Sequence, residues 1–177
     1  MIETPRLLLR RWRDADVAPF FAMGQDAEVM RHLGPPMSRA DCEAAAMRQN
    51  ACAEEHSTCF WAVERRADGV FLGFCGIKPG PAGTPIAGQP EIGWRLARAS
   101  WGQGYALEAA QASLDRAWSA TDWPGGAAIT VPANERSWGL MIRLGMTRDP
   151  AGDFDHPSLA PDDPLRRHLT YRIRRPR

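Results

Sequence analysis

The segment from Glu91 to Trp118 restricts the fold of this chain more than any other part of its sequence. Residues 91–96 are typical of a strand, and apolar residues recur at helical spacing from Gly104 to about Ala120. Between them lies the turn Trp101-Gly102-Gln103-Gly104-Tyr105-Ala106. Glycine has no Cβ, so the chain can turn sharply here and a ligand can approach the main chain closely. The sequence therefore predicts a strand, a glycine turn and a helix N-terminus in direct succession.

This predicted turn is suited to binding a phosphate or pyrophosphate. The first turn of a helix has N–H groups without intrahelical partners and lies at the positive end of the helix dipole. An ordinary connection between a strand and a helix is the alternative, because short glycine motifs also occur in turns that bind nothing. The turn is neither the Gly-x-Gly-x-x-Gly fingerprint of dinucleotide-binding proteins nor the Gly-Lys-Ser/Thr of phosphate loops.

The remaining patterns predict one domain that spans residues 1–177, in the order β-α-α-β-β-β-α-β-α-β-β. A length of 177 residues with 44% hydrophobic content is enough for a single core. The other strands are expected at 3–10, 59–65, 70–78, 127–131, 146–154 and 168–174, and the other helices from Asp14, from Ser38 to about Glu55, and from Ser137 to Leu144. This order is typical of an α/β (α+β) fold in which a mixed sheet lies between helices.

Four motifs in this order resemble those of the GCN5-related N-acetyltransferases (GNAT), in particular the branch that is similar to RimJ and RimL. They are the opening Thr4-x-Arg6-Leu7-x-Leu9-Arg10, the strand Glu91-Ile92-Gly93-Trp94, the turn 101–106, and Asn134-x-x-Ser137 before Leu144-Gly145-Met146. In the family's Gln/Arg-x-x-Gly-x-Gly/Ala motif, Gly104 and Ala106 match the last two fixed positions, whereas Trp101 replaces Gln or Arg. The resemblance covers nearly the whole chain. It implies the GNAT fold, with a mostly antiparallel central sheet flanked by helices.

The resemblance also implies acetyl-CoA as co-substrate and no metal. Main-chain amides of Gly102, Gln103, Gly104, Tyr105 and Ala106 would bind its pyrophosphate. The pantetheine would lie in a gap beside the strand 91–96, against the backbone from Trp94 to Leu96. The side chain of Asn134 would contact the pantetheine or cap the following helix, and the two roles are compatible.

The catalytic residues that the resemblance implies are Ser137 and Glu91. Many family members protonate the leaving thiolate with a tyrosine seven residues after the asparagine, a position that is Met141 here. Ser137 could give the sulfur a hydrogen bond instead, or simply open a helix. Glu91 could take the proton of the amine through water, orient the amine, or be a surface residue at a strand end. His156 and His168 are further candidates for the base, or residues that anchor a loop.

These observations favour an N-acetyltransferase that moves the acetyl group directly to a primary amine, either a protein N-terminus or a small molecule. The alternatives are a non-catalytic acyl-CoA sensor, which Met141 and Trp101 favour, and an interaction domain without a ligand. The net charge of +1 gives no reason to expect nucleic acid or a membrane as partner. The cysteines have no zinc-site spacing and predict reduced thiols in a cytoplasmic protein. The protein is expected to be either a monomer or a homodimer.

Two charged segments near the C-terminus are expected to be solvated. One is acidic, from Asp149 to Asp163, and could instead surround the acceptor site and attract a cation. The other is basic, from Arg166 to Arg177, and could instead be a docking surface for acidic groups.

Overall fold

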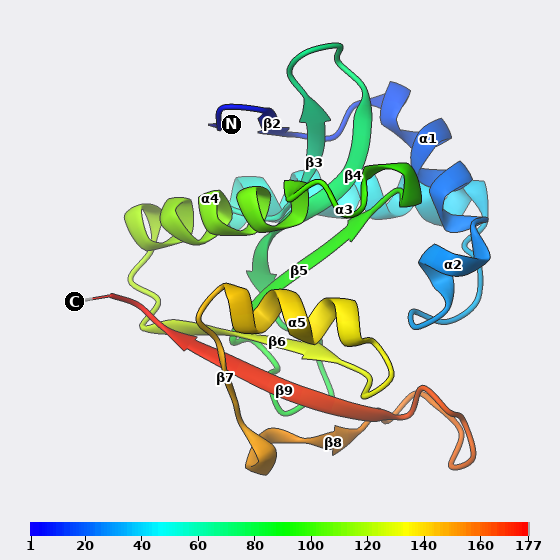
Figure 1. Ribbon diagram of the computed structural model, residues 1–177, viewed down its shortest axis with the longest axis vertical. Helices are drawn as coiled ribbons and strands as arrows, with labels where there is room; N and C mark the ends of the chain where they lie inside the picture. Colours follow the sequence, from blue (N-terminus) through cyan, green and yellow to red (C-terminus); the bar gives the residue numbers. More distant parts are fainter. Residues whose placement is uncertain (177) are drawn as a thin grey trace.

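A computed structural model describes residues 1–176, in which a nine-stranded sheet carries helices on both faces (Figure 1). The strands are β1 (Ile2–Glu3), β2 (Leu7–Arg10), β3 (Phe60–Arg65), β4 (Phe71–Pro79), β5 (Pro90–Leu96), β6 (Gly125–Thr130), β7 (Thr147–Arg148), β8 (Phe154–Asp155) and β9 (Arg167–Arg174). They lie in the order β1-β2-β3-β4-β5-β6-β9-β7, and β8 also pairs with β9. Among these strands only β5 and β6 pair in parallel, so the predicted mixed, mostly antiparallel sheet is confirmed.

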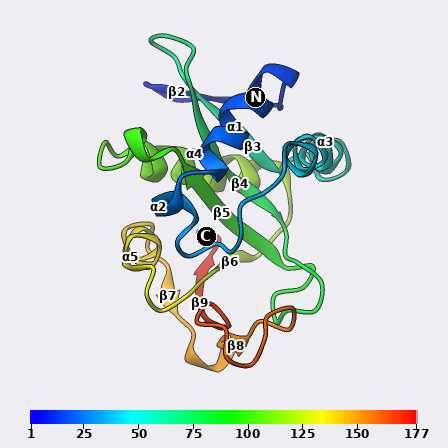
Figure 2. The same ribbon diagram turned by 90° about the vertical axis from the view of Figure 1, so that its right-hand side faces the viewer.

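The helices form two layers. They are α1 (Asp14–Gly24), α2 (Ala27–Met30), α3 (Arg39–His56), α4 (Tyr105–Ala120) and α5 (Glu135–Arg143). Figure 2 shows α4 and α5 on one side of the sheet and α3 on the other. The larger apolar cluster lies mainly between the sheet and α4 and α5, and a second lies between the sheet and α1, α2 and α3. Within residues 1–176, no helix combines the length and apolar character that crossing a membrane requires.

Several boundaries lie where local sequence signals predict them. Ser38 caps α3, because its hydroxyl accepts a hydrogen bond from the N–H of Asp41 at 3.1 Å. Gly145 follows the end of α5 with a φ of +79°, a left-handed conformation that glycine adopts without strain. The turn at Asp68-Gly69 joins β3 and β4 as an antiparallel hairpin. These signals are read from neighbouring residues alone, which explains why the sequence predicts them well.

Other boundaries differ from the prediction. The strand expected at 146–154 is interrupted by a 3-10 turn at Pro150–Gly152, because proline has no N–H to donate to a ladder. The short helix α2 was not expected, since four residues are too few to show a period; Asp26 caps it by accepting from the N–H of Glu28. Helix α5 begins at Glu135 rather than Ser137, and β6 covers 125–130 rather than 127–131.

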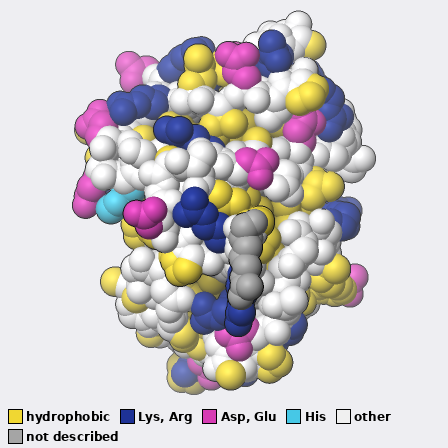
Figure 3. Space-filling model, turned by 90° about the vertical axis from the view of Figure 1, so that its left-hand side faces the viewer, with side chains coloured by type: hydrophobic (Ala, Val, Ile, Leu, Met, Phe, Trp, Pro, Cys, Tyr) yellow, Lys and Arg dark blue, Asp and Glu magenta, His cyan; other side chains and the backbone are white. Residues whose placement is uncertain are grey.

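The acidic and basic segments near the C-terminus pair with each other. The expectation of solvated segments is wrong for Asp153, whose side chain is 8% exposed, whereas Arg167 and Asp155 remain about half exposed. Arg172 contacts Asp149 at 2.5 Å, and Arg167 contacts Asp155 at 3.3 Å. Arg148 forms a further ion pair with Asp153. Figure 3 shows one face of the molecule, on which cationic and acidic side chains are intermixed.

A buried ion pair joins β2 to α1. The guanidinium of Arg10, which is 6% exposed, donates to both carboxylate oxygens of Asp16 at 2.6 and 2.8 Å and to Glu64 at 2.7 Å. Asp16 also accepts from the N–H of Arg13 and so closes the first turn of α1. The hydrogen bond to Asp16 raises the pKa of Arg10. Each charge is therefore desolvated but fully partnered, the arrangement that makes burial tolerable.

We expect Asp16→Ala to lower the free energy of unfolding by about 3–5 kcal/mol, because it leaves a buried guanidinium without its main partner. Urea unfolding would measure the loss. Asp14→Ala, which removes an exposed carboxylate from the same helical turn, is the matched control and should cost about 1 kcal/mol or less. Equal losses in the two variants would contradict a structural role for the buried pair.

Candidate functional site

The parallel strands β5 and β6 separate along their length. They pair at a single register, Glu91 with Ala127. Beyond this point β5 stays paired with β4 as far as Leu96, and β6 stays paired with β9 as far as Thr130. The sheet therefore opens toward the C-terminal ends of two parallel strands, the place where ligands commonly bind in open sheets.

The backbone of β5 directs hydrogen-bonding groups toward this gap. The N–H of Ala97 donates to the carbonyl of Leu72, and alternate residues of an antiparallel ladder point to the same neighbour. Arg95 is therefore directed at β4, whereas Trp94 and Leu96 direct their N–H and carbonyl groups at the gap. The carbonyl of Leu96 accepts from the indole of Trp101 at 2.8 Å. The N–H and the carbonyl of Trp94 and the N–H of Leu96 also lie on this edge, where β6 no longer pairs with them.

The glycine turn lies at the end of β5 and leads directly into α4. Gly102 and Gly104 have φ values of +73° and +79°, which favour glycine. Gly104 is the N-cap of α4, and no side chain within residues 1–176 caps the helix there. The first amides of α4 therefore lack a side-chain acceptor at the positive end of the helix, which suits an anion.

Arg6, which immediately precedes β2, holds this turn. Its guanidinium donates to the carbonyl of Gln103 at 2.9 Å and to Glu108 at 2.6 Å, and it lies 4.6 Å from the ring centroid of Tyr105. A Cβ added to Gly104 would lie 3.3 Å from the same guanidinium. The Tyr105 side chain is buried, so a ligand at this turn would meet its main-chain amide. The sequence identified Arg6 only as part of the opening motif, since its contacts lie about a hundred residues away along the chain.

Trp101 connects the two sides of the gap. Its indole bonds to β5 as described, and the guanidinium of Arg136 lies 4.6 Å from its ring centroid. Arg136 belongs to α5, which follows β6, so this cation–π contact spans from one diverging strand to the helix after the other. Trp101 thus has a structural function at the position where the family motif has Gln or Arg.

Asn134 and Ser137 follow β6, on the other side of the gap. Asn134 is the N-cap residue of α5, yet its side chain does not cap the helix; its carbonyl accepts from the N–H of Ser137 at 3.0 Å. Ser137 is a half-buried residue, and its hydroxyl bonds to no other residue within 1–176. Met141 is 1% exposed in the main core and offers no proton donor. The capping alternatives are therefore not seen, and both polar side chains remain free for a ligand.

Glu91 lies where β5 and β6 still pair. Its carboxylate contacts Nζ of Lys78 at 2.9 Å, and the side chain is 14% exposed, so Glu91 is not a freely solvated residue. Lys78, the only lysine in the sequence, lies 4.9 Å from the ring centroid of Phe60. The two histidine candidates, His156 and His168, lie at β8 and β9, where their rings pack against each other in a tilted arrangement with centroids 5.2 Å apart. Burial lowers the pKa of His168.

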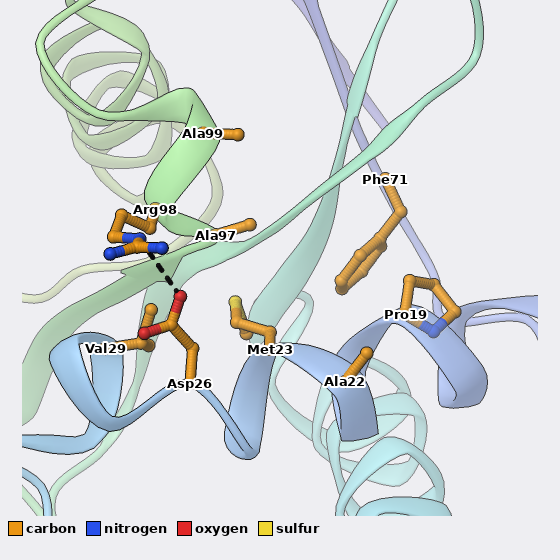
Figure 4. A pocket seen from close by; sticks show the side chains of 9 residues that line it. All are labelled: Pro19, Ala22, Met23, Asp26, Val29, Phe71, Ala97, Arg98 and Ala99. Atoms are coloured by element: carbon orange, nitrogen blue, oxygen red, sulfur yellow. Dashed lines mark ion pairs between the residues drawn. The ribbon is translucent and has the colours of Figure 1, made fainter.

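A groove of about 330 Å³ lies on the opposite face of the sheet from α4, where α1 and α2 meet the end of β5 (Figure 4). Its walls are mostly apolar and come from four segments of the chain, which is why sequence patterns do not identify it. The ion pair between Asp26 and Arg98, at 3.2 Å, lies at its edge. The lining includes Met23, Val29, Phe71 and Ala97.

Comparison with known proteins relates this geometry to one family. Residues 6–147 match the model of the acetyltransferase (GNAT) domain. The chain is 32% identical over 146 residues to YkkB of Bacillus subtilis (strain 168), an uncharacterized protein; the match covers 81% of this chain and 83% of YkkB.

Solved structures have the same fold. An acetyltransferase from Agrobacterium tumefaciens str. C58 superposes with a TM-score of 0.79 at 26% identity, over 98% of this chain and 94% of that one. RimL, a ribosomal L7/L12 α-N-protein acetyltransferase in complex with coenzyme A, has a TM-score of 0.77 at 14% identity, over 97% and 95% of the two chains. At this identity the similarity to RimL concerns the fold alone.

We expect Gly104→Val to weaken CoA binding at least tenfold, about 1.4 kcal/mol, because a branched side chain would fill the space over the helix N-terminus and disfavour the left-handed backbone. Calorimetric titration with CoA would measure the change. Gly88→Val is the matched control: Gly88 has a φ of +70° with open space around it, in the loop before β5. A folded Gly104→Val protein that binds CoA as well as the Gly88→Val variant would exclude this turn as the binding site.

Proposed function

This chain belongs to the GNAT acetyltransferase family, and we propose that it transfers the acetyl group of acetyl-CoA directly to a primary amine. The proposal rests on three features of the elements that flank one gap in the sheet. These are a helix N-terminus built on glycines, the backbone edge of β5, and the half-buried hydroxyl of Ser137. A non-catalytic CoA-binding protein would need the first two features but not the third.

The cofactor would bind along the gap from the glycine turn inward. Amides of the turn from Gly102 to Ala106 would hold the pyrophosphate, since successive N–H groups at a helix N-terminus bind anions. Arg6 lies beside Gly104 and would hold the turn in place for the phosphates, while its ion pair with Glu108 offsets its charge. The backbone of Trp94 and Leu96 would pair with the pantetheine, as would the side-chain amide of Asn134.

Bound acetyl-CoA supplies an activated acetyl group as a thioester. An N–H on the β5 edge would donate to the carbonyl oxygen as negative charge develops on it. The Ser137 hydroxyl would donate a hydrogen bond to the sulfur as the carbon–sulfur bond breaks. Glu91 would accept the amine proton through water or hold the protonated amine near the thioester. Lys78, which pairs with Glu91, would keep the carboxylate in place.

The acceptor would be either a protein N-terminus or a small amine. The name of RimL describes an enzyme that acts on a protein N-terminus, which makes peptides reasonable first substrates. Thiol release should be measured with N-terminal peptides, polyamines and aminoglycosides, alongside calorimetry with CoA. Turnover of any of these amines supports the proposal. CoA binding without turnover would favour the acyl-CoA sensor, and the absence of both would contradict each reading.

Ser137→Ala should lower kcat by about 10- to 100-fold, which corresponds to the free energy of a hydrogen bond to a charged group. The Kd for CoA should be nearly unchanged. The difference is expected because the sulfur becomes anionic only as the bond breaks. Steady-state kinetics and calorimetry would separate the two effects. Ser119→Ala, an exposed serine on α4, serves as control. A kcat equal to that of the control would remove Ser137 from the mechanism.

Glu91→Gln separates two roles for this carboxylate. If Glu91 accepts the proton, kcat should fall by about 10²–10⁴-fold and the pH–rate profile should change. If Glu91 attracts the protonated amine, KM should rise with little change in kcat. Lys78→Gln, which breaks the same ion pair but keeps the carboxylate, shows how much of either effect is structural. Should Glu91→Gln behave like Lys78→Gln, proton removal would fall to water, His156 or His168.

A further inference from the structure

Arg95 is a largely enclosed arginine without a partner. It lies on β5, and its Nε and Nη1 atoms are buried with no hydrogen-bond acceptor among residues 1–176. The third nitrogen, Nη2, is not among the enclosed atoms. A guanidinium has five N–H donors and stays charged at any physiological pH, so these donors must find acceptors or remain unsatisfied.

Arg10, another enclosed arginine of the sheet, has anionic partners that Arg95 lacks. Arg10 bonds to the carboxylates of Asp16 and Glu64, which satisfy its charge and its donors. Around Arg95 the neighbouring titratable group is the thiol of Cys42 on α3, and burial raises the pKa of that thiol. Burial lowers the pKa of Arg95 itself, as expected for a cation that has no anion beside it.

Aromatic rings enclose the Arg95 guanidinium. It lies 5.4 Å from the ring centroid of Phe74 on β4 and 6.0 Å from that of Phe20 on α1. Phe60 stacks on Phe74 at 5.4 Å and continues this wall along the sheet. Cation–π contacts stabilise the charge in part, but ring faces do not replace the acceptors that the in-plane N–H groups need.

The position of Arg95 relates it to the proposed acetyl transfer. Side chains alternate along a strand, so Glu91, Gly93 and Arg95 share the face of β5 that α4 does not cover. The backbone of Trp94, adjacent to Arg95, faces the gap between β5 and β6. The guanidinium therefore lies beside the gap but on the other face of the sheet from α4.

We propose that Arg95 binds the carboxylate of the acceptor, and that the acceptor is a small molecule with a primary amine and a carboxylate, such as an amino acid. This inference rests on the proposed function. A carboxylate would reach the guanidinium through Nη2, the nitrogen that is not enclosed, and would supply the missing negative charge and an acceptor of the right geometry. The aromatic wall and the apolar groove that begins at Ala97 would contact the rest of the molecule.

The test compares substrates that differ only at the carboxylate. Thiol release from acetyl-CoA is measured with phenylalanine and methionine and with their carboxamides, using the full chain. The wild type should favour each acid over its amide by at least tenfold in kcat/KM. Arg95→Gln should remove this preference and leave the amides and the Kd for CoA unchanged. Arg95→Lys, which keeps the charge, should retain part of the preference.

Further variants and a binding measurement keep the result interpretable. Arg95→Met keeps the apolar packing and should raise the Tm, because it removes an unpartnered buried cation. Arg116→Gln, an exposed position on α4, should change nothing. Calorimetry with acid and amide in the presence of CoA tests the subsite without turnover. Absence of acetylation with every amine would contradict the proposed function. Equal binding of acid and amide, or equal losses for both in Arg95→Gln, would overturn the carboxylate site.

Discussion

The single register between β5 and β6 is the constraint on which the rest of this molecule depends. Past Glu91 and Ala127 the two strands have different neighbours, and each follows its own neighbour to its end. Backbone groups on the inner edge of β5 therefore lose the strand partner that a continuous sheet would provide. Such groups require another acceptor or donor, and the indole of Trp101 supplies one of them at Leu96.

Arginine side chains join several elements of this fold. Arg6 fixes the glycine turn, Arg10 joins β2 to α1, and Arg136 stacks on Trp101. Each contact uses the planar guanidinium either as a fork of donors or as a flat surface against a ring. An ammonium group would not reproduce either function. The only lysine, Lys78, occupies a place where a point charge beside a carboxylate is sufficient.

The sequence predicts what neighbouring residues determine. The cap at Ser38, the hairpin at Asp68-Gly69, the glycine turn and the core stripe of α4 all follow from local chemistry. The pairing of Glu91 with Lys78 does not, because it depends on the register that the loop between β4 and β5 sets. Pro150 is visible in the sequence, but the alternation on both sides of it predicts one strand, which the 3-10 turn interrupts.

The isolation of Arg95 could not be predicted for a different reason. Its identity is plain in the sequence, but the lack of an acceptor is a property of everything packed around it. A similar limit applied to the charged segments near the C-terminus. Each segment alone resembles a solvated loop or tail, and only the pairing of β9 with β7 and β8 brings their opposite charges together.

The divergence of β5 from β6 also has a thermodynamic consequence. The two halves of the sheet pair at one register only. A molecule that hydrogen-bonds to both inner edges therefore adds hydrogen bonds between the two halves. Such a ligand binds the folded chain and not the unfolded one, and it raises the free energy of unfolding by RT ln(1 + [L]/Kd), about 2.7 kcal/mol at a hundredfold excess over Kd. The stability of this sheet then depends on the concentration of ligand as well as on the sequence.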